Sequence, residues 1–547
     1  MKLVDGTTGN EAERIITRWN EMVQVIAAVG VLLSGCQKAP ACDRCDTLQI
    51  AATGEPTTLV PPLIGETVGR DIGDLVFERL LVLRQGGSPV DTAAYEPGLA
   101  TRWERVDSLT WRFTLRPGAR WSDGRPVEPD DVIFSFAAYT DTALGAPAGS
   151  SLNGVVLAPA GPGQVTVRFP RVYPELLFDG ATQVRIFPKH LWAALPRSGW
   201  GSDSTLKRLV GSGRYRIVDW TRGQSLRLER IDSTGGGFRR VVWRFSEDQD
   251  AALNLVLSGE ADLLETVTSP AARNRVAKDS NVALLRYPSA VYGFLGFRHA
   301  DARGVAHPVL GDLAVRRALA LAIDRPTSVH AVIGPDATPI AGPVSPASWI
   351  YGDSLGAPAF DPARSRALLD SAGWREGADQ IRHRGGRPLA VDILVPSTSS
   401  ARKQLAETIQ QMWKAVGVAA TITGVDFPVF QQRLAQGRFD AMIGAWLDEP
   451  SPRNLADQWT SSGIGKLNYG RYRSARFDSM FAAAGATRDP VAARAGWQRA
   501  IRVLNDETAA VFLYSPTNAA VLTRRLSGIE LDPFSWLHQI NAWSKIP

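Results

Sequence analysis

Apolar and polar residues alternate most clearly between residues 110 and 116. Tryptophan, phenylalanine and leucine stand at every second position there and are separated by arginine and threonine, which predicts a strand with one buried face. The next pair, Pro117 and Gly118, favours a turn, because proline presets one φ angle and glycine accepts a positive one. A second short strand over residues 119–121 then completes a predicted hairpin.

The hydrophobic period changes to that of a helix after Pro129, a residue that suits the first position of a helix. Asp130 and Asp131 place negative charge at the positive N-terminal end of this helix. Its apolar stripe is supplied by Val132, Ile133, Phe136 and Ala137. The pattern over 110–137 therefore predicts a hairpin, a turn and an amphipathic helix.

Strand-like and helix-like segments alternate along the rest of the chain, which indicates the α/β class. The chain has 547 residues, too many for one compact core, so we expect two or three domains. Hydrophobic residues make up 44% and charged residues 21%, as in ordinary globular proteins. We find no short internal repeat of the kind that solenoid proteins carry.

The formal net charge of +6 comes mainly from arginines spread along the chain. The densest basic pieces, Arg239–Arg240 and Arg524–Arg525, are short and are not interleaved with aromatic residues. A platform for nucleic acid would need both features. We therefore expect no nucleic-acid partner and interpret the arginines as a solvated surface.

The N-terminal region has the features of an export signal. An apolar run of about a dozen residues over 22–33 is too short to cross a bilayer. The sequence Leu-Ser-Gly-Cys that ends at Cys36 resembles a bacterial lipobox. We expect residues 1–35 to be a lipoprotein signal peptide, Cys36 to be lipidated and 36–46 to be a tether. The alternative is a buried helix that ends at Gly35, and the long, net acidic stretch 1–21 is unusual for a leader.

All three cysteines lie near this end of the chain, at positions 36, 42 and 45. A body without cysteine suits an exported protein. Zinc binding by Cys42 and Cys45 would require two further ligands nearby, and none are present. We expect a local disulfide or two unreacted thiols.

Residue patterns of catalysis are missing from the sequence. The six histidines are scattered, and no pair is spaced for a metal on a helix. There is no nucleophile elbow and no phosphate-binding loop. We expect a protein that is not an enzyme and that holds no cofactor and no metal.

Several motifs in a fixed order point to one family. The segment 110–136 reads W-x-F-x-L-R-x-G, then D-G-x-P, then D-V-x-F-S. Further matching segments are 95–103, 187–191, 211–217, 248–262, 312–325 and 361–374. Together they resemble the bacterial extracellular solute-binding proteins of family 5, the dipeptide, oligopeptide and nickel type, which are lipoproteins that supply ABC importers. Glu128 departs from the family's threonine, so we expect a helix start weaker by about 1 kcal/mol.

The resemblance implies an α/β, two-lobed periplasmic-binding-protein-like fold of type II, with an extra subdomain inserted in lobe 1. Carried onto this chain, lobe 1 would be 46–288 and 512–547, and lobe 2 would be 289–511. The inserted subdomain would be about 70–175. Apolar segments near 287–297 and 511–516 would be the strands that cross between the lobes.

The resemblance also implies a ligand site at the segment 439–450 of lobe 2. Asp448 is the candidate to bind the α-ammonium group of a peptide, since a charge-assisted hydrogen bond is worth roughly 1.5–3 kcal/mol. Trp446 would be a pocket wall, and Leu447 and Glu449 are its neighbours, with Glu449 a rival for the charged role. Asp448 stands two places after Trp446, closer than in peptide binders. The alternative for the acidic pair is a surface turn.

On lobe 1, a loop that includes Glu66 and Thr67 would pair through its backbone with a peptide main chain. The implied mechanism is closure about a hinge on a di- or oligopeptide, followed by delivery to a membrane permease and ATPase. An oligosaccharide or a metal chelate on the same fold is the main alternative. An exported hydrolase and a sensor lipoprotein are further alternatives.

Overall fold

The computed structural model describes residues 45–146, 152–201, 207–232 and 236–546. The expected signal peptide and the lipidation site at Cys36 lie outside this part of the chain, as does Cys42. Cys45 is disulfide-bonded, in agreement with the disulfide alternative for the N-terminal cysteines. No helix within the described residues has both the length and the apolar composition to cross a membrane.

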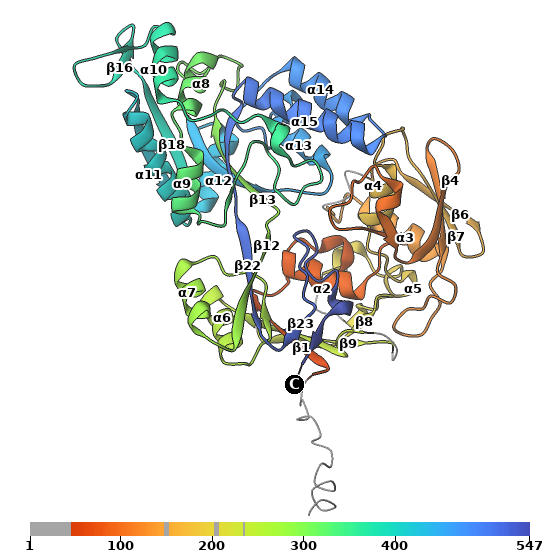
Figure 1. Ribbon diagram of the computed structural model, residues 1–547. Coiled ribbons are helices and arrows are strands. Elements are labelled where there is room, and N and C mark those ends of the chain that lie inside the picture. The colour runs from red at the N-terminus through yellow and green to blue at the C-terminus, as the bar shows by residue number, and fades with distance from the viewer. Residues whose placement is uncertain (1–44, 147–151, 202–206, 233–235, 547) are drawn as a thin grey trace, which may run out of the picture.

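The first lobe is built on a seven-stranded mixed sheet at the bottom of Figure 1. Its strands, in spatial order, are β12 (Val282–Pro288), β22 (Thr517–Thr523), β11 (Leu263–Leu264), β1 (Thr47–Thr53), β10 (Arg240–Ser246), β9 (Ser225–Arg230) and β8 (Tyr215–Thr221). Helices α6 (Gln249–Leu257) and α7 (Pro270–Lys278) pack on one side, where they share an apolar cluster with Ala51 and Val521. Helix α2 (Thr67–Val76) contributes to a larger cluster that includes Leu48 and Ile50.

The second lobe is built on a six-stranded sheet in the upper part of Figure 1. Its strands, in spatial order, are β14 (Thr338–Pro339), β21 (Ala510–Ser515), β13 (Val291–Phe297), β20 (Ala441–Leu447), β18 (Ala390–Pro396) and β19 (Ala419–Val425). One apolar cluster joins it to α8 (Leu313–Leu321), α9 (Arg325–Val332), α10 (Pro362–Ser371) and α11 (Ser400–Lys414). Another joins it to α12 (Phe427–Gln436), α13 (Leu455–Trp459), α14 (Ala475–Gly485) and α15 (Pro490–Asp506).

Within the described residues the chain passes directly from one sheet to the other at two places. Strand β12 of the first sheet leads into β13 of the second through Ser289 and Ala290, and β21 returns to β22 through Pro516. The pairs β12–β22 and β13–β21 lie next to each other in their respective sheets. Ser289 and Ala290 are both buried. The expected two-lobed α/β fold is confirmed.

A four-stranded antiparallel sheet forms a third unit at the right of Figure 1. Its strands, in spatial order, are β4 (Ala100–Arg105), β5 (Thr110–Leu115), β7 (Gln164–Arg168) and β6 (Val156–Gly161). Helix α3 (Pro129–Tyr139) packs against it. Shorter elements near this unit are β2 (Leu81–Leu83), β3 (Tyr95–Pro97), α4 (Leu176–Thr182) and α5 (Lys189–Trp192). Two further small sheets lie elsewhere. One consists of β15 (Arg375–Glu376), β16 (Arg382–Arg384) and β17 (Arg387–Pro388), and the other of β23 (Leu526–Ser527) and β24 (Ser544–Lys545).

The strand predicted at 110–116 is β5, with Phe113 and Leu115 buried and Trp111 partly buried. The predicted hairpin with 119–121 is wrong. Strand β5 pairs with β4 and β7 instead, and the short segment makes only an isolated bridge between Arg120 and Pro126. Three alternating residues are too few to bind a neighbouring strand when two longer strands are available.

Asp131 explains why the motif of residues 110–136 and the motif of residues 187–191 occur together. Its carboxylate accepts hydrogen bonds from the backbone N–H of Glu128 (2.9 Å) and of Lys189 (2.8 Å). The Oδ2 atom of Asp123 also lies 2.7 Å from Nε2 of His190. The bond to Glu128 is half of a capping box, so the start of α3 keeps a cap although glutamate is a poor one.

Gly211 lies where only glycine fits between two units of the structure. Its carbonyl accepts from the backbone N–H of Ser122 (2.9 Å). A Cβ atom at position 211 would lie 1.8 Å from the carbonyl oxygen of Val76, at the end of α2. This close approach ties the segment 122–127 to the first lobe.

We predict that Gly211→Ala lowers the free energy of unfolding by about 1–3 kcal/mol, because backbone rather than a flexible side chain must move. Thermal or urea-induced unfolding followed by circular dichroism measures this. Gly424→Ala is the control, because nothing lies within 4 Å of a Cβ atom there. Equal stability of the Gly211 variant and the unchanged protein would contradict the assignment.

Candidate functional site

The expected ligand site lies where the second lobe meets the crossing strands. Asp448 directly follows β20, and its backbone N–H donates to the carbonyl of Ala290 (2.5 Å). Ala290 belongs to the two-residue link between β12 and β13. The site is therefore anchored beside the hinge, where the angle between the lobes is set.

The carboxylate of Asp448 is held by three hydrogen bonds. Its Oδ2 accepts from both the backbone N–H and the hydroxyl of Ser345, each at 2.9 Å. Its Oδ1 accepts from the backbone N–H of Glu449 (2.9 Å). A carboxylate can accept about four hydrogen bonds, so one acceptor position is left, on Oδ1. A donor from a ligand could occupy it.

Burial governs the charge of this carboxyl group. Asp448 is 1% exposed. Desolvation raises the pKa of Asp448 to about 7, although the three hydrogen bonds lower it. The group is thus poised between its neutral and charged forms near neutral pH, and a cationic ligand would favour the charged form.

Trp446 lies in an aromatic cluster of the second lobe. Its ring centroid is 4.6 Å from that of Phe294 and 5.6 Å from that of Trp459. Leu447, in contrast, is 48% exposed. The tryptophan is therefore at least partly a packing residue, while the leucine is available for contact.

Glu449 connects this segment with the first lobe. Although the residue as a whole is exposed, desolvation of its carboxyl raises the pKa, and nearby Arg70 of α2 offsets part of this rise. Arg70 also donates to the hydroxyl of Thr67 (3.2 Å). Glu66 and Thr67 are exposed at the start of α2. The predicted residues of the two lobes are thus related through Arg70, which sequence reasoning missed.

Two carboxyl groups near Arg70 were also missed. Asp71 is 8% exposed and accepts from the indole N–H of Trp536 (2.7 Å). Burial, together with the neighbouring Glu265, raises the pKa of Asp71 well above its usual value. Burial also raises the pKa of Glu265 to about 6. This side of the first lobe is therefore rich in acidic groups that ionise reluctantly.

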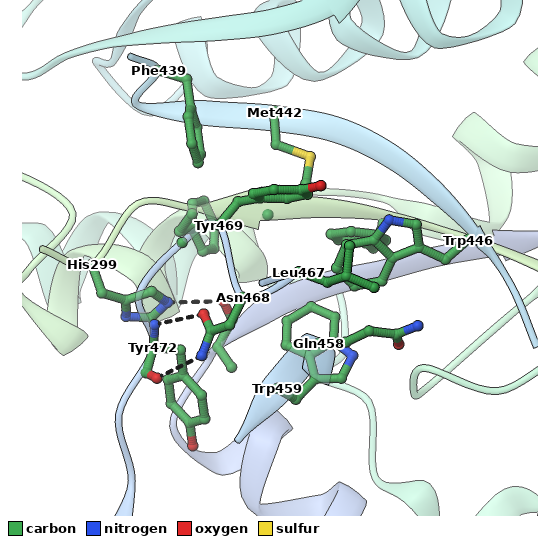
Figure 2. Close-up of a pocket in the computed structure, with 15 residues that line it drawn as sticks. His299, Phe439, Met442, Trp446, Gln458, Trp459, Leu467, Asn468, Tyr469 and Tyr472 are labelled. Carbon is green, nitrogen blue, oxygen red and sulfur yellow. Dashed lines mark hydrogen bonds between the residues drawn. The ribbon is translucent and has the colours of Figure 1, made fainter. Parts of the chain in front are cut away.

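A cavity inside the second lobe borders Trp446 (Figure 2). Its volume is about 20 Å³, room for about one water molecule. The polar groups on its wall bond to one another: Asn468 Nδ2 donates to the Tyr472 carbonyl (2.9 Å) and Oδ1 accepts from the Tyr472 N–H (3.0 Å). Burial lowers the pKa of His299 to about 3, so its ring is neutral. This cavity belongs to the lobe's core.

A larger cavity of about 280 Å³ lies between the four-stranded unit and the second lobe. Trp111, Tyr173 and Arg105 line it from one side, and Arg488 and Pro490 from the other. Among the described residues no group of three or more histidine, cysteine, aspartate or glutamate side chains is arranged to hold a metal ion.

Comparisons with known proteins place these features in context. Residues 94–466 match the family model of the bacterial extracellular solute-binding proteins, family 5. The oligopeptide-binding protein AppA of Bacillus subtilis is 22% identical over 547 residues, covering 95% of this chain and 98% of that protein. A solved structure of AppA with a nonapeptide superimposes with a TM-score of 0.72 at 21% identity, covering 92% and 99% of the two chains. NikZ from Campylobacter jejuni in complex with Ni(L-His) gives 0.73 at 23% identity, covering 92% and 100%.

We predict that Asp448→Asn stabilises the ligand-free protein more at pH 8 than at pH 5. A pKa raised by folding contributes stability below the unfolded pKa and loses it as the pH rises through about 7. Asparagine avoids this loss, which is on the order of 3 kcal/mol.

Thermal unfolding at both pH values measures the difference. Asp219→Asn, at an exposed position on β8, is the control for replacing an aspartate by asparagine. If the Asp448 variant gains the same stability at both pH values, folding does not raise the pKa of the Asp448 carboxyl group.

Proposed function

Because the chain belongs to the bacterial extracellular solute-binding proteins of family 5, we propose that it binds di- and oligopeptides between its lobes and delivers them to an ABC importer. The observation that carries this proposal is the buried carboxylate of Asp448, which is fixed beside the hinge and keeps one acceptor position. A peptide's α-ammonium group is a donor of matching charge. The relatives named oligopeptide-binding proteins support the ligand class.

In this proposal the two lobes hold different parts of the ligand. Asp448 binds the ammonium group, and Ser345 and the N–H of Glu449 orient its carboxylate. Trp446 and Leu447 line the ligand, and the backbone at Glu66 and Thr67 pairs with its main chain. A ligand that touches both lobes favours the closed form, which a permease and its ATPase then recognise.

We also propose an extracytoplasmic location with a lipid anchor. Residues 1–35 would be removed, Cys36 would carry the lipid and 36–46 would form the tether. The lobes would be 46–288 with 516–547, and 289–515, with a subdomain at about 70–175, so the boundary that the sequence suggested at 511/512 moves to Pro516. Strand β21 remains in the second sheet to Ser515, which supports a return to the first lobe at Pro516. The role is binding, without catalysis and without a cofactor.

A non-peptide ligand, such as an oligosaccharide or a metal chelate, is the second candidate. The two-residue separation of Trp446 and Asp448 favours it, because the family resemblance implies a longer spacing in peptide binders. The relative NikZ, solved with Ni(L-His), is of this kind. A hydrolase would require measurable turnover of a peptide or ester, and a sensor lipoprotein would lack a permease partner.

We predict that the protein binds a peptide with a free α-amino group roughly 10–100-fold more tightly than its N-acetylated form, since a charge-assisted hydrogen bond is lost on acetylation. Isothermal titration calorimetry with Ala-Leu-Ala and acetyl-Ala-Leu-Ala measures this. Asp448→Asn should bind the free peptide more weakly and no longer distinguish the two.

Glu449→Gln is the matched control, because it removes the neighbouring carboxylate and leaves Asp448 in place. It should still distinguish the two peptides. If the Glu449 variant alone loses this discrimination, the ammonium site is Glu449. If unmodified protein binds both peptides equally, Asp448 does not bind an ammonium group.

We predict that Cys36→Ala abolishes incorporation of labelled palmitate when the full chain is produced in a bacterium, because the acyl-bearing thiol is gone. Cys42→Ala is the control and should remain labelled. Gel fluorography of cells grown with labelled palmitate measures this. Undiminished labelling of the Cys36 variant would rule out this residue as the anchor.

A further inference from the structure

A second contact between the lobes lies just beyond the ligand segment. Arg453, five residues after Asp448, donates from Nε to Oε2 of Glu175 (2.6 Å). Its other nitrogen, NH2, donates to both carboxylate oxygens of Asp179 (2.7 and 2.8 Å). The hydroxyl of Ser451 also donates to Glu175. Asp179 lies in α4, and Glu175 directly precedes this helix. Arg453 of the second lobe therefore binds two carboxylates at the first turn of α4, which lies outside that lobe.

The groups in this contact are shielded from water. The side chains of Glu175 and Asp179 are 3% and 2% exposed, and that of Arg453 is 29% exposed. The guanidinium carbon also lies 5.0 Å from the ring centroid of Tyr173, whose hydroxyl donates to Asp179 (2.7 Å). Two buried carboxylates that share one cation are costly to leave unpaired. Their burial therefore depends on Arg453.

The position of this contact distinguishes it from an ordinary stabilising ion pair. Each lobe has its own apolar clusters, and α4 belongs to the cluster of the first lobe and the four-stranded unit. In Figure 1, α4 and the four-stranded unit lie at the right, away from the strands β12, β13 and β22 that cross between the lobes. Rotation about the crossing strands would separate Arg453 from α4. In the separated state water could solvate both carboxylates and the guanidinium.

The chain between the two sites is short and constrained. Ser451 caps the short helix 452–454 by accepting from the N–H of Arg453 (3.4 Å). The carbonyl of Pro450 accepts from the indole N–H of Trp349 (2.9 Å). Prolines at 450 and 452 restrict the backbone further. Movement of Asp448 relative to the first lobe would therefore be passed to Arg453.

We propose that Arg453 is a positioning residue for closure. By binding Glu175 and Asp179 it holds the second lobe against α4, and this raises the population of the closed form. None of the three groups is a candidate ligand contact, so the fastening acts whether or not the cleft is occupied. This inference rests on the proposed function for its biological purpose, because closure matters only if the cleft captures a ligand. Its physical content concerns the lobes alone.

Small-angle X-ray scattering of the ligand-free full chain tests the proposal, so a wrong ligand assignment does not affect the result. Arg453→Ala should increase the radius of gyration. It should also increase hydrogen–deuterium exchange in α4 and in residues 449–454. Arg453→Lys keeps the charge but loses the planar fork, and it should give intermediate values. Glu175→Gln with Asp179→Asn should open the lobes less than Arg453→Ala, because both deeply buried carboxylates become neutral and the more exposed guanidinium keeps amide oxygens as hydrogen-bond acceptors.

Arg298→Ala is the matched control. It removes an arginine of similar side-chain exposure (21% against 29%), whose ion pair with Asp440 at 3.4 Å lies within the second lobe. It should leave the radius of gyration unchanged. The proposal is overturned if folded Arg453→Ala matches the unchanged protein in both measurements, or if Arg298→Ala expands as much. If Arg453→Ala does not fold, Arg453→Lys is judged by the same two criteria.

Discussion

Two strand crossings join the separately packed lobes and limit how the lobes can move relative to each other. Within the described residues the two sheets are joined directly at Ser289–Ala290 and at Pro516. Contacts away from these points can break without unfolding either core. The structure concentrates polar groups at such contacts, where Asp448 lies beside the hinge and Arg453 lies away from it. The lobes, which each fold around apolar clusters, are therefore in contact here through hydrogen bonds and ion pairs and through the packing of Val90 on the second lobe.

Carboxyl groups shielded from water are a second feature of the two lobes. Asp71, Glu265 and Asp448 are all partly or wholly removed from water, and burial raises the pKa of each. A cation that enters such surroundings favours the ionised carboxylates, so its binding is coupled to release of protons. The Arg453 contact has the same basis, since its guanidinium supplies the positive charge that keeps the buried carboxylates of Glu175 and Asp179 ionised.

Local patterns in the sequence predicted the elements whose stability is decided locally. The alternation over 110–116 gave β5, and the motif order gave the two-lobed fold. The pairing of 119–121 was wrong, because three residues carry too little information to choose among competing strands. The contacts that shape the site were beyond local patterns. Ser345 reaches Asp448 across 103 residues, and Arg453 reaches Glu175 across 278.

The same limit applies to the role of each acidic residue. The sequence placed Asp448 and Glu449 side by side without a physical reason to choose between them. The structure separates them, because Asp448 is 1% exposed and held by Ser345, whereas Glu449 is exposed and close to Arg70 of the other lobe. Burial and partners, which only the folded chain supplies, distinguish a fixed binding group from an adaptable one.

We propose that the segment at Asp448 captures peptides through their α-ammonium group. Native mass spectrometry of the protein as purified tests it most directly, with fragmentation of whatever is released. We expect bound masses that fragment as peptides with free amino ends and that are lost in Asp448→Ala. Bound species that are saccharides, metal chelates or peptides with blocked amino ends would contradict it.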